Sequence, residues 1–106
     1  MHAFDVLGDP VRRLILELLL EGEKSSGEIV EAVVAEFGIT QAAVSQHLRV
    51  LRESGFAKAR PEGARRLYCI ESTALRDVDA WLERFRGFWE SKLDSLGEEI
   101  ARGKKE

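Results

Sequence analysis

Residues 39–59 read ITQAAVSQHLRVLRESGFAKA, and this stretch decides how the rest of the chain is interpreted. Thr40 is a good N-cap, because its hydroxyl can accept a hydrogen bond from a backbone N–H of the first helical turn. Val44, Leu48 and Leu51 then recur at helical spacing, so one face of the predicted helix is buried. The stretch therefore predicts an amphipathic helix that is anchored in a core.

A second face of this predicted helix carries side chains of the kinds that contact DNA bases. Its members are small, amide-bearing or cationic: Thr40, Gln41, Ala42, Ser45, Gln46 and Arg49. Small residues allow close approach in a major groove, amides pair with adenine edges, and arginine pairs with guanine or phosphate. The solvated face of an ordinary amphipathic helix has a similar composition, so this helix alone leaves both interpretations open.

The segment after this helix has the pattern of a basic β-hairpin. Residues 56–60 alternate in polarity, residues 67–70 are β-prone, and PEGA at 61–64 has the composition of a turn. Three arginines lie near the expected tip: Arg60, Arg65 and Arg66. A basic hairpin directly after a recognition helix is typical of a wing, whose arginines contact phosphates or the minor groove. The alternative is a surface hairpin without a binding role.

Two further helices are predicted before the recognition helix. Asp9 and Pro10 suit the N-cap and first position of a helix, and the apolar residues that follow have the i, i+3, i+4, i+7, i+8 spacing of a core helix. Ser25 and Glu28 have the spacing of a capping box, which starts the next helix. Gly38 is expected to end it, and so short a link predicts a helix-turn-helix.

The two ends of the chain are expected to form a dimer interface. Residues 1–8 can form a short helix, and residues 72–102 form a long one with an apolar seam. The seam residues repeat at spacings of three, four and seven: Leu75, Val78, Leu82, Phe85, Trp89, Leu93, Leu96 and Ile100. So long a seam favours a partner helix from a second copy across a two-fold axis. The expected interface residues are Phe4, Leu7, Leu82, Phe85, Trp89, Leu93 and Leu96.

Composition and charge favour a single DNA-binding domain over residues 1–106, with core and wing in residues 10–70. The chain is 44% hydrophobic and 33% charged, with a net charge of −3. Residues 40–70 nevertheless hold six Lys/Arg and two Asp/Glu, whereas residues 1–39 hold three and eight. A positive excess confined to the recognition helix and wing is the electrostatic pattern expected of a DNA reader.

Several other classes of protein are disfavoured. There is no apolar run of membrane-spanning length, and MHAFDVLGDP lacks the features of a secretory signal, so a cytoplasmic protein is expected. Cys69 is the single cysteine, which leaves no internal disulfide and no cysteine-pair metal site. No catalytic triad, glycine-rich phosphate loop or carboxylate pair can be argued, so we expect neither an enzyme nor a cofactor.

Four single residues are interpreted as structural. Arg12 and Arg13 are expected on a solvated helix face, with phosphate contact as the alternative. His47 lies toward the inner edge of the recognition helix and is expected to bond to the backbone, with a ligand or pH-switch role as the alternative. Cys69 is expected to be a buried, inert thiol rather than a redox sensor.

Two long segments together resemble the ArsR-type winged-helix repressors over nearly the whole chain. They are FDVLGDPVRRLILELL at 4–19 and AVSQHLRVLRESGFAKARPEGARRLYCI at 43–70, followed by a last helix with Trp81 and Trp89. The resemblance is to the branch without metal-binding cysteines, since SSGEIVEAV at 25–33 has no Cys or His and the last helix has no His. Metal sensing at either family site is therefore not expected.

The resemblance implies a homodimer in which the first and last helices form the interface. It also implies that the protein represses its own operon by binding an imperfect palindrome. It assigns Gln41, Ala42, Ser45, Gln46 and Arg49 to the major groove, and Arg60, Arg65 and Arg66 to the wing.

The sequence thus predicts a mainly α-helical winged helix-turn-helix protein that binds double-stranded DNA as a homodimer. The function expected is a sequence-specific regulator, most simply a repressor of an inverted-repeat operator. One alternative is a winged-helix module for protein contacts, which the basic segment disfavours. Another is a regulator that responds to a small apolar ligand held near Phe85, Phe88 and Trp89; dimer packing explains these three residues without a ligand.

Overall fold

The structure, a computed structural model, describes the backbone of residues 2–104 and the side chains of residues 2–94, 96 and 97. Ile100, the last residue of the predicted seam, lies outside the described side chains. Within the described range the elements follow in this order: α1 (Ala3–Leu7), α2 (Pro10–Leu20), β1 (Lys24–Ser25), α3 (Ser26–Phe37), α4 (Gln41–Glu53), β2 (Ala57–Glu62), β3 (Arg65–Ile70) and α5 (Ser72–Lys104).

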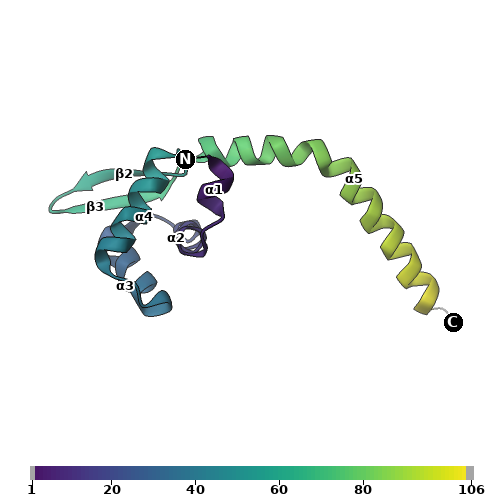
Figure 1. Cartoon of the computed structure of the whole chain (residues 1–106), viewed down its shortest axis with the longest axis horizontal. Helices are drawn as coiled ribbons and strands as arrows, with labels where there is room; N and C mark the ends of the chain where they lie inside the picture. The colour runs from purple at the N-terminus through teal and green to yellow at the C-terminus, as the bar shows by residue number, and fades with distance from the viewer. Residues whose placement is uncertain (1, 105–106) are drawn as a thin grey trace.

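Helices α1 to α4 and the strands form a body from which α5 projects (Figure 1). α4 packs against α2, α3 and β2, and α1 contacts both α2 and α5. The extents of 63 × 28 × 22 Å reflect the projecting helix, and the radius of gyration is 18.6 Å. A compact chain of this length would have a radius of gyration of about 13 Å. Among the described residues, no helix has the length and apolarity to span a membrane.

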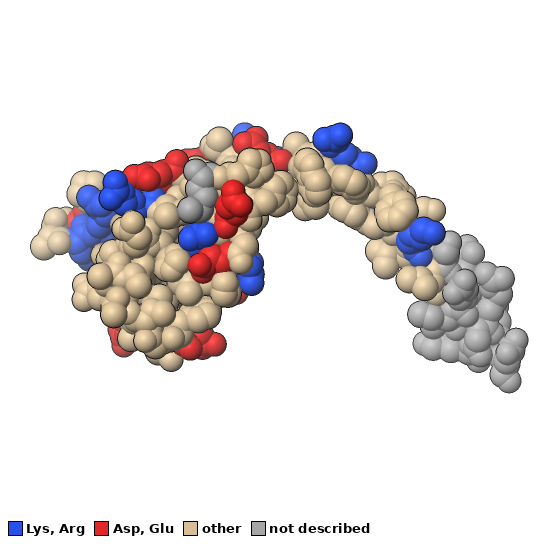
Figure 2. Space-filling view, in the orientation of Figure 1, with Lys and Arg blue, Asp and Glu red and all other residues tan. Residues whose placement is uncertain are grey.

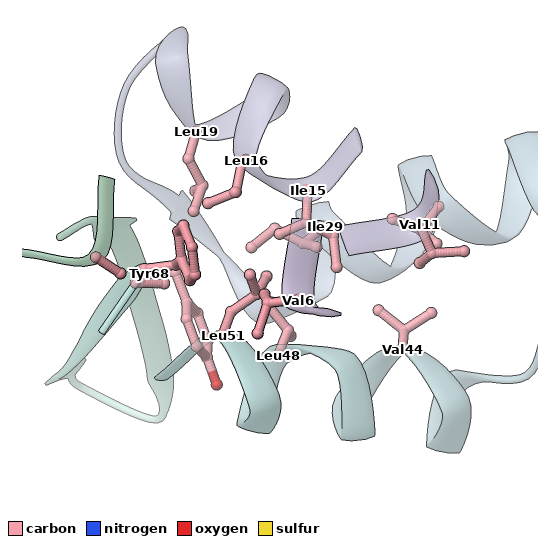
Figure 3. Packing of buried hydrophobic residues seen from close by; sticks show 14 residues of the cluster. Val6, Val11, Ile15, Leu16, Leu19, Ile29, Val44, Leu48, Leu51 and Tyr68 are labelled. Carbon is pink, nitrogen blue, oxygen red and sulfur yellow. The ribbon is translucent and has the colours of Figure 1, made fainter. Parts of the chain in front are cut away.

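The core lies between α2 and α4, with α3 and the sheet closing its sides. Val44, Leu48 and Leu51 of α4 point toward Ile15 of α2 and its neighbours (Figure 3). The exposed fractions of the three α4 residues are 0%, 2% and 0%. The periodicity that predicted a buried face of the recognition helix is therefore confirmed.

The predicted helix starts are also confirmed by their hydrogen bonds. The Oγ1 of Thr40 accepts from the backbone N–H of Ala43 at 3.1 Å, which caps α4. Ser25 and Glu28 form both halves of the capping box at the start of α3, with distances of 3.1 and 2.9 Å. α3 and α4 are separated by three residues, so the pair is a helix-turn-helix.

The wing is part of a three-stranded antiparallel sheet of order β1-β3-β2 rather than a hairpin alone. β1 was not predicted, because two residues are too few to show a period. The turn is also shorter than the predicted 61–64, since Glu62 pairs with Arg65 and only two residues lie between them. Pro61 fits into β2 because this strand lies at the sheet edge, where an N–H is not needed. Gly63 supplies the positive φ of +59° that the tight turn requires.

Three single-residue expectations were wrong. Arg12 is buried, at 9% exposure, because its guanidinium donates to carbonyl oxygens at the end of α1 instead of facing solvent. The hydrogen-bond partner of His47 is the Arg12 side chain rather than the backbone. Cys69 is half-buried instead of buried, because it lies near the end of β3 opposite the exposed Lys58.

Candidate nucleic-acid interface

The predicted DNA-facing residues lie on the surface of α4 that points away from the core. Thr40, Gln41, Ala42, Ser45, Gln46 and Arg49 are all exposed. Because Val44, Leu48 and Leu51 fix the opposite side of the helix in the core, this exposed face has a defined direction. A rigid helix that presents small, amide and cationic side chains has the composition needed to enter a major groove.

The exposed face of α4 continues into a hollow that it shares with the wing. The hollow has a volume of about 440 Å³ and is lined by Ser26, Ser45, Gln46, Leu48, Arg49, Arg52, Arg66 and Tyr68. Four of these were not predicted as part of the interface, namely Ser26, Leu48, Arg52 and Tyr68. Arg52 could have been found, because it lies three residues after Arg49 and seven after Ser45, which places all three on one helix face. We name this surface, from α4 across to Arg66, the basic hollow.

The three wing arginines do not all lie on the same face of the hairpin. In the antiparallel register, Arg60 is opposite Leu67 and Glu62 is opposite Arg65, so Arg60 and Arg65 share one face of the hairpin. Arg66 alternates onto the other face together with Tyr68, which also lines the basic hollow. Of the predicted wing arginines, only Arg66 therefore lines the same hollow as residues of the recognition helix.

Ion pairs further separate the wing arginines. Arg60 donates two hydrogen bonds to the carboxylate of Glu23, at 3.0 and 2.8 Å. This pairing lowers the pKa of Glu23 and raises that of Arg60. Arg65 lies 3.6 Å from Glu62, whereas among the described residues no carboxylate lies within 4.0 Å of Arg66. Of the three wing arginines, Arg66 thus has the positive charge most available to a phosphate.

Arg49 has a partner on its own helix. Its Nε donates to Glu53 Oε1 at 2.9 Å, one helical turn further on. Both side chains remain more than half exposed, at 61% and 63%, so solvent screens the pair strongly.

Figure 2 shows Lys and Arg side chains gathered over the wing end of the body, opposite the projecting α5. The local positive charge predicted from the sequence is thus visible on the surface.

The projecting α5 carries an apolar surface beyond the body. Leu75 and Val78 pack against the core, whereas Phe85, Leu93 and Leu96 are 41%, 62% and 53% exposed. Leu82 and Trp89 are half-buried. At the base of α5, Trp81 lies 5.1 Å from the Phe4 ring and 4.7 Å from the Phe85 ring, measured between centroids. Phe4 is 41% exposed and Leu7 packs against the core.

A hollow of about 640 Å³ lies where α1 meets the start of α5. It is lined by His2, Ala3, Phe4, Ser54, Ala74, Asp77, Val78 and Trp81. The residues predicted for an apolar ligand, Phe85, Phe88 and Trp89, are not among them. Within the described residues there is also no cluster of three His, Cys, Asp or Glu arranged to hold a metal ion.

Comparisons with known proteins agree with this geometry. The family model described as "Bacterial regulatory protein, arsR family" matches residues 9–59, from the cap of α2 into β2. The HTH-type transcriptional regulator Rv2034 of Mycobacterium tuberculosis is 36% identical over 84 residues, which are 79% of this chain and 75% of the relative. The transcriptional repressor SdpR of Bacillus subtilis is 31% identical over 84 residues, covering 79% of this chain and 89% of the relative.

A solved structure gives the same fold. The homodimeric winged helix-turn-helix DNA-binding domain of Mb0332 from Mycobacterium bovis, described as a possible ArsR-family regulator, superposes with a TM-score of 0.60 at 27% identity. The superposition covers 80% of this chain and 75% of that one. Together with the two relatives and the helix-turn-helix geometry, it shows that the chain belongs to the arsR family of bacterial regulatory proteins and is a DNA-binding transcription regulator, not an enzyme.

Proposed function

We propose that this protein is a dimeric repressor that binds an inverted-repeat operator with one α4 helix in each half-site. The observation that carries the proposal is the basic hollow, in which the exposed face of α4 and Arg66 of the wing form one continuous surface. A homodimeric relative and a repressor among the relatives support the dimer and the direction of regulation. A protein with this role acts where DNA is, so we place it in the cytoplasm.

In the proposed complex, the first turns of α4 enter the major groove. Gln41, Ser45 and Gln46, all exposed on α4, are assigned to base edges, and Arg49 is assigned to a guanine. Arg66 lies across the hollow and is assigned to the backbone beside the groove. Arg60 and Arg65 lie on the other face of the wing and are paired with acidic residues. They are therefore expected to add to the positive electrostatic potential around the wing rather than to contact DNA directly.

Mobility shift with the DNA directly upstream of the gene tests the proposal. A repressor of its own operon is expected to shift this DNA at nanomolar concentration in physiological salt, with a footprint of two symmetric half-sites. Unrelated DNA of equal length serves as the control, and its affinity is expected to be lower by a factor of about 1,000 or more. Equal binding to both DNAs would contradict sequence-specific recognition. No binding to either, even in low salt, would favour a protein-interaction module.

Arg49 and Arg66 are expected to differ in what they recognise. Arg49→Ala is expected to lose about 1–3 kcal/mol on the operator and little on unrelated DNA, because a base contact is sequence-specific. Arg66→Ala is expected to weaken both DNAs equally and to reduce the salt dependence by about one counterion per subunit, as a phosphate contact does. Affinities measured between about 50 and 200 mM salt separate the two effects.

Arg84→Ala is the matched control, since Arg84 is an exposed arginine on α5 away from the basic hollow. It removes the same charge and is expected to change neither the affinity nor the salt dependence appreciably. If Arg49→Ala and Arg66→Ala both behave like Arg84→Ala, the assignment of the interface is wrong.

Metal ions are not expected to release the operator. The chain has one cysteine and two histidines, and zinc sites are built mainly from these two residue types. Titrating the protein–operator complex with zinc, cadmium or arsenite is expected to leave its dissociation constant within about twofold. Release by one equivalent of metal per protomer at micromolar concentration would contradict this expectation.

A further inference from the structure

A buried guanidinium joins three helices of the body. Arg12, in the first turn of α2, donates from Nε to the carbonyl oxygen of Val6 and from Nη2 to that of Asp5, both at 2.9 Å. These carbonyls lie near the end of α1. Its Nη1 lies 3.3 Å from Nδ1 of His47 on α4. One side chain therefore contacts α1 and α4 while it belongs to α2.

The chemistry of arginine fixes the protonation of His47 in this contact. A guanidinium has only donors, so Nδ1 of the imidazole must accept, and the ring proton must lie on Nε2. His47 is half-buried and stands between the buried Leu48 and the exposed Gln46. A hydrogen bond at this edge of α4 adds to the core packing of Val44, Leu48 and Leu51 in restraining the rotation of the helix about its axis. That rotation decides where Gln46 and the other exposed side chains point.

We propose that Arg12 and His47 form a positioning contact that aligns the recognition helix with α1, and that operator binding requires His47 to be neutral. The inference rests on the proposed operator function. α1 carries Phe4, which packs on Trp81 at the base of α5, so the contact connects the expected dimer surface to the DNA-facing helix. In a two-fold dimer, two recognition helices must be held about 34 Å apart, and such a connection maintains that geometry.

Protonation of His47 removes this contact. A proton on Nδ1 replaces the acceptor with a donor and places a second cation 3.3 Å from the Arg12 guanidinium. Asp9 is the described carboxylate nearest to this pair, with its Oδ2 3.9 Å from Arg12 Nη1.

Most other charged groups around α4 are exposed, including Arg13 and Glu17 of α2, and Arg52 of α4 is half-buried. The charged residues of α3 and β2, which pack against α4, are exposed, and so is Asp5 of α1. Arg49, the next charged residue along α4, pairs with Glu53. Among the described residues, Asp9 is the one carboxylate within 4.0 Å of the Arg12 guanidinium or the His47 ring.

Two substitutions of His47 separate a positioning contact from simple packing. Asn carries its side-chain oxygen where the imidazole carries Nδ1, so His47→Asn keeps an acceptor for Arg12 but cannot take up a proton. His47→Leu replaces the imidazole with an apolar side chain and so removes the acceptor. At pH 8, His47→Leu is expected to bind the operator about tenfold more weakly, as the loss of a hydrogen bond to a charged group would give. His47→Asn is expected to stay within about twofold of the unmodified protein.

A general structural defect in His47→Leu would also change its binding to unrelated DNA and its sedimentation, so both are measured as controls. His47→Leu is expected to remain dimeric and to bind unrelated DNA normally, because no phosphate contact is altered. A uniform loss of affinity for both DNAs, or equal operator affinity of the Leu variant and the unmodified protein, would overturn the proposal.

The pH dependence gives an independent test. Once acid protonates His47, the unmodified protein is expected to lose operator affinity, whereas His47→Asn, which takes up no proton, is expected to keep it. The only other histidine, His2, caps α1, and His2→Gln is the control that should retain the full acid-dependent loss. An equal acid loss in His47→Asn would overturn the requirement for a neutral imidazole.

A measurement without DNA keeps the inference testable if the operator assignment fails. Nitrogen NMR of the His47 ring at pH 8 is expected to show a proton on Nε2 and none on Nδ1. A proton on Nδ1 at this pH would overturn the contact itself. Failure of the unmodified protein to bind the operator, with the Nε2 form observed, would instead contradict only the proposed function.

Discussion

Phe85→Asp is expected to convert the dimer into folded monomers and to lower operator affinity by about 100-fold or more, because the avidity of two linked half-sites is lost. Phe85 is 41% exposed on the projecting part of α5, in the middle of the apolar surface. Its neighbours one turn away in either direction are Trp81, Leu82, Phe88 and Trp89. None of the positions three or four residues away along α5 holds a cation that could pair with an aspartate there.

The expected loss is several kcal/mol for each dimer. A charge that is buried without a partner typically destabilises a structure by about 3–5 kcal/mol. The two-fold axis of the dimer would introduce this charge twice. Phe85 is a sharper target than Trp89, because Arg86 lies over the Trp89 ring at 5.8 Å and could pair with an aspartate placed there. The protomer itself should stay folded, since Phe85 contributes little to its core.

Sedimentation equilibrium and operator titration measure the two consequences. Ser91→Asp introduces the same carboxylate on the polar side of α5 and is the matched control, expected to remain dimeric with normal affinity. A Phe85→Asp protein that stays dimeric and binds the operator normally would show that the interface lies elsewhere. The exposed apolar surface of α5 would then need another explanation, because monomers rarely expose so extended a patch.

Phe56→Ala is expected to remove about 3–5 kcal/mol from the free energy of unfolding, a large share of the total for a domain of this size. Phe56 is fully buried and follows the recognition helix directly. Its N–H donates to the carbonyl of Leu51 at 3.0 Å, and its own carbonyl accepts from Glu71 at 2.9 Å. The backbone of Phe56 therefore lies where α4, the wing and the start of α5 meet, and its ring is part of the buried core.

Urea denaturation measures the loss, and Phe88→Ala is the matched control. Phe88 is 68% exposed in the protomer, so removing its ring is expected to change the stability of isolated protomers by less than about 0.5 kcal/mol. Gly55 adds a second constraint at the same junction, since its φ of +78° turns the chain out of α4. A Phe56→Ala protein with unchanged unfolding free energy would show that this junction is not part of the stabilising core.

Local patterns in the sequence determined the helices and their buried faces. Asp9, Ser25 and Thr40 cap helices through bonds to backbone N–H groups two or three residues away, so short spacings predict them. The burial of Val44, Leu48 and Leu51 follows from the helical period alone. The exposed Gln and Arg face of α4 was predicted for the same reason, because the period that buries one face exposes the other.

Tertiary structure decided which distant groups meet. Arg60 pairs with Glu23 across 37 positions, and Arg12 contacts His47 across 35, so no local period can reveal either partner. The separation of Arg66 from Arg60 and Arg65 depends on the register of β2 against β3, which the two-residue turn sets. β1 exists only because β3 offers it an edge. Periodicity reports whether a side chain is buried, but the path of the chain decides what it is buried against.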